Sequence, residues 1–381
     1  MTEQTGILIV GAGPTGLTAA VALTLAGHDV TVVDAAAEGA NTSRAAVVHA
    51  RSLEVLQPLG VTGELVARGI EAGRFTVRDR DRVLVPVPFD GLPTAHPYTL
   101  MLSQAETEAV LLRRFTDLGG RVLRPVRLTA LTEDAAGITA EFESREPIRA
   151  QYVVGADGMH STVREQAGIG FGGGDYAESF VLADVRLRGG ALPADEVVLY
   201  FATAGMVVVA PLPGGTHRVV ATVDAAPEHP DAAFVQALLD ERGPRRVRAV
   251  VEDVVWSSRF RVHHRVADRY RSGRILLAGD AAHVHSPAGG QGMNTGIQDA
   301  VALADALHTA LTSGDDAPLD AYAAARRPVA EQVVGLADRL TRLATVGPRV
   351  RPVRNLLLRA AGHVPAVRRG LALRLSGLVY R

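Results

Sequence analysis

The chain has 381 residues, of which 47% are hydrophobic, and its formal net charge is −1. This length allows two domains, and the near-zero charge gives no reason to expect a nucleic-acid or membrane-surface partner. The sequence contains no cysteine, and all 40 basic residues are arginine. Disulfides, thiolate catalysis, iron–sulfur clusters and cysteinyl-linked cofactors are therefore excluded, as are lysine Schiff bases and P-loops.

The first elements in chain order form a βαβ unit. The apolar run at residues 7–10 predicts a buried strand, residues 14–26 predict a helix, and residues 29–33 predict a second strand. Asp34 ends that second strand, where its carboxylate can accept hydrogen bonds from the hydroxyls of a ribose. This arrangement indicates a dinucleotide site without distinguishing NAD from FAD.

A G-x-G-x-x-G motif joins the first strand to the helix. We expect Gly11 to allow the turn, Gly13 to let a pyrophosphate approach, and Gly16 to allow close helix–strand packing. Pro14 opens the helix, whose amino end offers free N–H groups and a partial positive charge to the phosphates.

A second glycine segment, Gly155-Ala156-Asp157-Gly158, follows a predicted strand at 152–154. Its carboxylate could meet the nucleotide from the other side, or Asp157 could cap a short helix over 159–164. The sequence leaves both interpretations open. Helices are also predicted at 53–59 and 104–118.

A third segment starts with Gly279 and Asp280 after a predicted strand at 275–278, which places Asp280 for a ribityl chain. The loop that follows contains glycines that let a flat ring lie against the backbone, and the start of a helix that can stabilise negative charge on a reduced flavin. These loop residues are Pro287, Gly289, Gly290, Gly292, Met293 and Asn294. Together the three segments predict one FAD site.

The remaining sequence predicts an α/β (α+β) fold with a discontinuous Rossmann-like domain, an inserted β-rich substrate domain and C-terminal helices. The β-rich part shows mainly strand patterns, with one helix at 232–242. We expect a FAD-binding domain from 1–74, 98–174 and 266–325, a substrate domain from 75–97 and 175–265, and a helical segment from 326–381.

Several polar features have simpler interpretations. His283 and His285 lack a third ligand at suitable spacing, so they predict no metal site. The arginine clusters at 245–248 and 349–354 predict solvated helix faces. The amino terminus has no signal-peptide pattern, and no run approaches the about 20 apolar residues of a membrane-spanning helix, which predicts a soluble, cytoplasmic protein.

The chain resembles the class A FAD-dependent aromatic hydroxylases, which share the p-hydroxybenzoate hydroxylase fold, and it is most similar to the branch acting on aromatic polyketides. The resemblance rests on the first two glycine motifs, the segment SRAAVVHAR, Leu102-Ser103-Gln104 and the stretch 274–294. It implies that Arg44 and Gln104 contact FAD, that Asp157 marks a motif shared by FAD and NAD(P)H, and that Pro287 and the following glycines line a flavin peroxide pocket. Many members continue into a thioredoxin-like domain, which we expect this chain to lack.

The resemblance also implies the chemistry. NADPH or NADH, bound transiently, would reduce a non-covalently held FAD, and dioxygen would add at flavin C4a to give a hydroperoxide that hydroxylates an electron-rich, polycyclic aromatic ring. The motifs leave open Baeyer–Villiger insertion, epoxidation, antibiotic modification, a reductase, and a non-catalytic flavin-binding protein. They assign no substrate-activating base. The expected lack of the thioredoxin-like domain favours a monomer.

Overall fold

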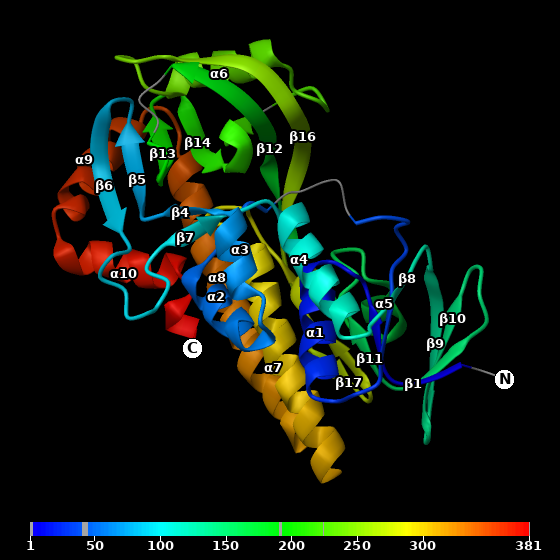
Figure 1. Cartoon of the computed structure of the whole chain (residues 1–381). Helices are drawn as coiled ribbons and strands as arrows, with labels where there is room; N and C mark the ends of the chain where they lie inside the picture. The colour runs from blue at the N-terminus through cyan, green and yellow to red at the C-terminus, as the bar shows by residue number, and fades with distance from the viewer. Residues whose placement is uncertain (1–2, 40–44, 190–192, 224, 381) are drawn as a thin grey trace.

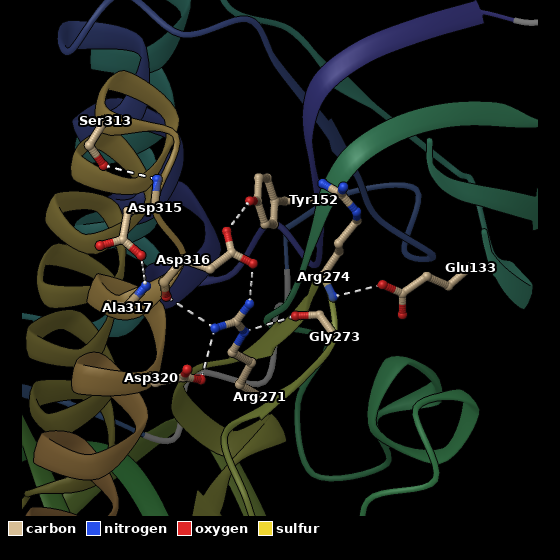
Figure 2. A network of polar contacts seen from close by, with 10 residues as sticks. All are labelled: Glu133, Tyr152, Arg271, Gly273, Arg274, Ser313, Asp315, Asp316, Ala317 and Asp320. Atoms are coloured by element: carbon tan, nitrogen blue, oxygen red, sulfur yellow. Dashed lines mark hydrogen bonds and ion pairs between the residues drawn. The ribbon is translucent and has the colours of Figure 1, made fainter. Parts of the chain in front are cut away.

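A computed structural model describes residues 3–39, 45–189, 193–223 and 225–380 of the chain. Within these residues, two eight-stranded sheets and a small three-stranded sheet are connected by helices. Figure 1 shows the mainly antiparallel sheet, called the second sheet, at the top of the molecule. The sheet with a parallel centre, called the first sheet, lies lower in the view, and two long helices run between and beneath them. The predicted mixed α/β architecture is confirmed.

The first sheet has a parallel centre in the order β18-β11-β1-β2-β8. Strand β1 lies between β2 and β11, so the chain leaves it at a topological switch point, where open α/β sheets bind their ligands. The predicted strands at 7–10, 152–154 and 275–278 all lie in this sheet. Its strands are β1 (Glu3–Val10), β2 (Val30–Val33), β8 (Val122–Leu123), β9 (Leu128–Asp134), β10 (Gly137–Phe142), β11 (Ile148–Gly155), β17 (Arg271–Ser272) and β18 (Ile275–Leu277).

Helices cover this sheet, and the two next to the glycine motifs, α1 and α7, pack against each other. Helix α4 begins with a side-chain N-cap, since the Ser103 hydroxyl accepts a hydrogen bond from the backbone N–H of Glu106. The helix predicted at 159–164 starts later than expected. The helices here are α1 (Pro14–Leu25), α2 (Ala50–Leu56), α3 (Thr62–Arg68), α4 (Gln104–Asp117), α5 (Thr162–Gln166) and α7 (Gly292–Ser313).

The second sheet has the order β19-β16-β12-β15-β14-β13-β5-β6 and is antiparallel except where β13 pairs with β5. Helix α6 (Ala232–Arg242), predicted from sequence, packs on one face of it. A small sheet of β3 (Val47–Val48), β7 (Thr99–Met101) and β4 (Ile70–Ala72) lies between the large sheets. The second sheet contains β5 (Arg74–Asp79), β6 (Arg82–Pro88), β12 (Phe171–Gly189), β13 (Glu196–Ala202), β14 (Gly205–Leu212), β15 (Thr216–Val223), β16 (Ala249–Ala267) and β19 (His283–Val284).

The C-terminal region forms α8 (Ala317–Thr345), α9 (Arg351–Gly362) and α10 (Pro365–Leu375). The segment boundary predicted at residue 325 falls inside α8, which continues without a break. Helices α9 and α10 pack against β6. Within the described parts of the chain, none of the helices combines the length and the apolar run needed to cross a membrane.

Two parts of the arginine prediction were wrong. Residues 245–248 lie in bends between α6 and the next strand, not on a helix face. Arg354 does not lie on a solvated face; it is only 4% exposed and points inward from α9. Its guanidinium donates hydrogen bonds to the carbonyl oxygens of Phe201 at 2.9 Å and Leu343 at 3.1 Å. Burial, with some repulsion from Arg351, lowers the pKa of Arg354 to about 10. Its Nε also donates to the side-chain oxygen of Asn355 at 2.9 Å. The sequence pattern missed this burial because none of these acceptors is a carboxylate.

Gly362 sets how closely α9 approaches the second sheet. A Cβ atom at this position would lie 2.1 Å from the carbonyl oxygen of Leu84. We therefore expect Gly362→Ala to lower the free energy of unfolding by about 1–3 kcal/mol, the usual cost of overpacking. Gly370→Ala in α10 is the matched control, since no atom lies within 4 Å of its Cβ position. Equal denaturation midpoints for the two variants would contradict this packing.

Candidate functional site

The first glycine motif is shaped by backbone contacts. Gly11 has a φ of +106°, and a Cβ there would lie 2.2 Å from the carbonyl oxygen of Ala156. A Cβ on Gly16 would lie 1.9 Å from the carbonyl oxygen of Gly11. Around Gly13, in contrast, no atom of the described residues lies within 4 Å of the Cβ position. Two of the glycines therefore serve packing, while Gly13 faces open space that a phosphate could occupy.

The amino end of α1 and Asp34 flank this open space. No side chain caps α1, and Pro14 at its start has no N–H to satisfy. The Asp34 carboxylate accepts hydrogen bonds from the backbone N–H of Ala12 at 2.6 Å and Ala36 at 2.7 Å. These bonds fix the carboxylate beside the glycine loop, with lone pairs remaining for the hydroxyls of a ribose.

Asp157 shares in capping α5, whose N-cap residue is Ser161. Its carboxylate accepts hydrogen bonds from the Ser161 hydroxyl at 2.5 Å and the backbone N–H of Val163 at 3.1 Å, at the start of α5. Burial raises the pKa of Asp157, although these hydrogen bonds oppose the shift. Of the two interpretations that the sequence left open, the contacts match the cap, and a nucleotide role for Asp157 stays a prediction.

The third segment meets the first through close contacts with Thr15. The Cβ positions of Gly279 and Gly296 lie 2.5 Å and 2.4 Å from the Thr15 hydroxyl, so only glycine fits at either place. Gly279 also has a φ of +61°. Asp280, next in the chain, is exposed at the carboxyl end of β18. The carboxylate predicted to bind the ribityl chain therefore lies on a turn whose position is fixed by the close contacts of Gly279 and Gly296 with Thr15.

A buried polar cluster under that turn was not predicted from the sequence. The Asp299 carboxylate in α7 accepts hydrogen bonds from the Gly279 N–H at 3.3 Å, His283 Nε2 at 2.7 Å and Arg326 Nε at 2.7 Å. Burial alone would raise the pKa of Asp299, but Arg326 and His283 outweigh it and hold this pKa below its usual value. Asp299 thereby anchors the turn that carries Asp280.

The Asp299 cluster gives His283 a structural role. His283 pairs with Asp299, whereas His285 donates from Nδ1 to the carbonyl oxygen of Ser286 at 2.9 Å. In the described part of the chain, no group of three or more His, Cys, Asp or Glu side chains is arranged to hold a metal ion.

The predicted flavin loop is held by Asn294. This buried side chain accepts a hydrogen bond from the His49 N–H at 2.7 Å and donates to the carbonyl oxygens of Val47 and Gly290, both at 2.8 Å. Gly289 and Gly290 have φ values of +87° and +65°. Asn294 therefore joins the loop to β3, a role beyond the backbone N–H group predicted for it.

The amino end of α7 also matches the prediction of a charge-stabilising site. No side chain caps it, and Gly292 and Met293 form its first residues. Pro287 is half-buried in the loop before it. Because the first N–H groups of a helix lack partners within the helix, this end can bind a group that carries negative charge.

His49 is a second residue whose role sequence reasoning missed. Its ring is buried, and its Nε2 donates to the carbonyl oxygen of Gly289 at 2.9 Å. Burial lowers the pKa of His49 to about 4, although the hydrogen bonds to backbone oppose this. The ring is therefore neutral at physiological pH and supports the flavin loop without adding charge.

Gln104 points toward the Arg44 segment, which was predicted to contact FAD. Its side-chain oxygen accepts a hydrogen bond from the backbone N–H of Ala45 at 3.4 Å, and its amide donates to the Glu108 carboxylate at 2.8 Å. Arg44, the residue before Ala45, lies outside the described residues. Gln104 thus contacts Ala45, the residue that follows the predicted FAD ligand Arg44.

The three segments form one site whose features fit FAD. Open space at Gly13 and the uncapped end of α1 suit the pyrophosphate, exposed Asp280 suits the ribityl hydroxyls, and the uncapped end of α7 suits the ring.

Comparison with known proteins decides the family. The family described as FAD binding domain matches residues 4–337. The 12-dehydrotetracycline 5-monooxygenase/anhydrotetracycline 6-monooxygenase of Streptomyces rimosus is 38% identical over 401 residues, covering 98% of this chain and 76% of that protein. The chain belongs to the class A FAD-dependent aromatic hydroxylases. It is a flavoprotein monooxygenase whose cofactor is FAD and whose reductant is NADPH or NADH, as is typical of the family.

Solved structures of other flavoprotein monooxygenases share its fold. The anhydrotetracycline hydroxylase OxyS from Streptomyces rimosus has a TM-score of 0.81 and 35% identity, covering 98% of this chain and 76% of OxyS. The p-nitrophenol 4-monooxygenase PnpA from Pseudomonas putida has a TM-score of 0.86 and 26% identity, covering 99% of both chains.

A methyl group at Gly13 tests the phosphate position in this flavoprotein. Gly13 has an extended backbone, with φ −77° and ψ −176°, and no neighbour near its Cβ position, so Gly13→Ala can fold normally. The methyl group would occupy the space assigned to the pyrophosphate, and we expect FAD affinity to fall at least about tenfold, or about 1.4 kcal/mol. Titration of the apoprotein with FAD, followed by flavin fluorescence, measures this.

The thermal midpoint of apo Gly13→Ala should match that of the wild-type apoprotein. Gly16→Ala is the contrasting variant, because its methyl group would clash with Gly11 and should destabilise the apoprotein itself. Wild-type FAD affinity in Gly13→Ala would show that the phosphates lie elsewhere.

The neutral state of His49 predicts a pH dependence. As the pH falls from about 6.5 toward about 4, the unfolded chain binds a proton at His49 that the folded chain does not. The free energy of unfolding should therefore decrease over this window, with His49 contributing up to about 3 kcal/mol. We expect His49→Gln to flatten the dependence of the thermal midpoint on pH, whereas His229→Gln, at an exposed position, should leave its slope unchanged. Parallel slopes for His49→Gln and wild type would refute this role.

Proposed function

We propose that this monooxygenase hydroxylates a polycyclic aromatic substrate of the natural-product type, using dioxygen and NADPH or NADH. The observation that carries the proposal is that one apolar cluster contains residues of the second sheet and also lies against the flavin loop. Aromatic and polyketide-like substrates are large and flat, and a site of this kind can bury them. The names of the tetracycline-pathway relatives support the same substrate class.

The cluster connects the two halves of the proposed active site. Ala210 and Leu212 of β14 lie in one buried group with Phe75 of β5, Ala46 before β3 and Leu375 at the end of α10. Leu375 and Val47 are the side chains nearest the Cβ positions of Gly289 and Gly290. The inner face of the second sheet and the proposed flavin peroxide pocket at Pro287, Gly289 and Gly290 are therefore adjacent.

When bound, FAD takes electrons from the nicotinamide and supplies the redox chemistry that activates dioxygen. The chain's own residues bind, orient and exclude water. The glycine loop and α1 would hold the phosphates, Asp34 the ribose and Asp280 the ribityl chain. The amino end of α7 would stabilise negative charge on the ring.

A polar pair on the inner sheet face is placed to orient the substrate. Arg218, only 3% exposed, makes two hydrogen bonds to the Asp184 carboxylate, at 2.7 Å and 2.8 Å. Arg218 pairs with Ala210 in the strand register, so both side chains lie on the face that carries the apolar cluster. We propose that this pair aligns phenolic hydroxyl groups; no general base is assigned.

The division into a FAD-binding domain, a substrate domain and a C-terminal segment stays a prediction, as do the monomeric state and the cytoplasmic location. The roles of Arg44 and Asp157 toward FAD or NAD(P)H also stay predictions.

The function is tested by oxidation of NADPH and NADH by the FAD-loaded enzyme, with and without a panel of polycyclic phenols. We expect some phenols to stimulate oxidation and to gain one oxygen atom by mass, with that atom coming from labelled dioxygen. Ring expansion or an epoxide would instead identify one of the alternative oxygenations.

The apoprotein, assayed with the same phenols, is the control and should give no oxygenated product. Flavin reduction at one rate with every ligand, and no product containing labelled oxygen, would refute the hydroxylase proposal and favour a reductase.

A further inference from the structure

The C-terminal segment carries a local excess of positive charge. Residues 339–381 contain ten arginines and neither Asp nor Glu, in a chain whose net charge is −1. Arg354 uses its donors internally, on carbonyl oxygens of neighbouring elements. Other arginines of the segment point outward, and some of them converge.

A pocket of about 300 Å³ opens between β6 and the turn that joins α9 to α10. Four basic side chains line this basic pocket, namely Arg82 of β6, Arg359 of α9, His363 of the turn and Arg368 of α10. No carboxylate lines it. Three separate elements therefore direct positive charge to one place.

The guanidinium groups of the basic pocket are available for a ligand. Within the described residues, Arg82, Arg359 and Arg368 take part in no ion pair and no side-chain hydrogen bond. The Nε atom of Arg368 is buried and has no partner. A buried donor without an acceptor costs free energy, and neighbouring guanidinium groups repel one another, so an anion in the pocket relieves both costs.

The packing of α9 builds the pocket. The close approach of Gly362 to the carbonyl oxygen of Leu84 brings the α9–α10 turn against β6. Arg82 on the strand is thereby held near arginines that lie more than 270 positions later in the chain. None of the lining residues belongs to the residues assigned to FAD.

We propose that the basic pocket is an anion-binding site that takes a phosphate group. A phosphate presents several oxygens in a tetrahedral arrangement, which suits arginines from several directions better than a planar carboxylate does. The phosphate belongs either to a soluble phosphate ester or to an anionic lipid headgroup. The outward face of α9 beside the pocket favours testing the lipid source, since Leu356 and Leu357 are 69% and 64% exposed there.

The first experiment measures binding of inorganic pyrophosphate to the FAD-loaded enzyme by isothermal titration calorimetry at low ionic strength. We expect saturable binding to one site, weakened at least about tenfold by the double variant Arg359→Gln/Arg368→Gln. Arg369→Gln, on the same helix but outside the pocket, is the charge control and should change affinity by less than about twofold. FAD content and thermal midpoint report whether each variant is folded.

Co-sedimentation with vesicles of phosphatidylcholine, with and without phosphatidylglycerol, separates the two sources. Binding only to phosphatidylglycerol vesicles, competed by pyrophosphate and weakened by Leu357→Ser, supports a lipid headgroup. Pyrophosphate binding without vesicle binding supports a soluble ester. Absence of both, or an equal loss in Arg369→Gln, would overturn the proposal, because the effect would then be absent or spread over the whole surface.

Discussion

The close approach of α1, the Gly279 turn and α7 is the constraint on which the rest of the site depends. Thr15 lies within 2.5 Å of the positions where side chains on Gly279 and Gly296 would begin. The absence of side chains at these two glycines lets α1 meet two segments that lie more than 260 residues later in the sequence, at one end of the parallel sheet. That meeting leaves the amino ends of α1 and α7 at the same end of the parallel sheet as Asp34 and Asp280, the carboxylates predicted to bind FAD. A larger residue at either glycine would separate the phosphate and ribityl parts of the site.

Buried polar groups support this arrangement in two different ways. Asp299 stays charged under the Gly279 turn because Arg326 and His283 compensate it. His49, under the flavin loop, stays neutral because it has no such partner and is buried. The charge of Asp299 is thus paired, and the ring of His49 carries no charge. Neither residue adds an uncompensated charge beside the predicted cofactor site.

The local parts of the fold were predictable from sequence, and the long-range parts were not. The β1–α1–β2 unit follows from an apolar run, a glycine motif and Asp34, all within 28 consecutive residues. Asp299 lies in an Ala-rich helix, where nothing in the sequence indicates that Arg326 will reach it from the next helix. Asn294 and His49 are linked across 245 positions. Arg354 looked like a surface charge because most of its partners are backbone carbonyl oxygens, which every residue has.

Helix α8 connects the cofactor half of the molecule to the second sheet. It touches the cofactor half through Arg326 and Asp299, and its Thr341 hydroxyl donates to Ser286 at 2.7 Å. Farther along, Ala344 packs with Phe180 and Phe201 of the second sheet. A single rod of 29 residues, about 44 Å long, therefore braces both halves of the enzyme. Hinge opening between the halves would separate α8 from one of them, and would therefore break either the buried Arg326–Asp299 ion pair or the apolar packing of Ala344 against the second sheet.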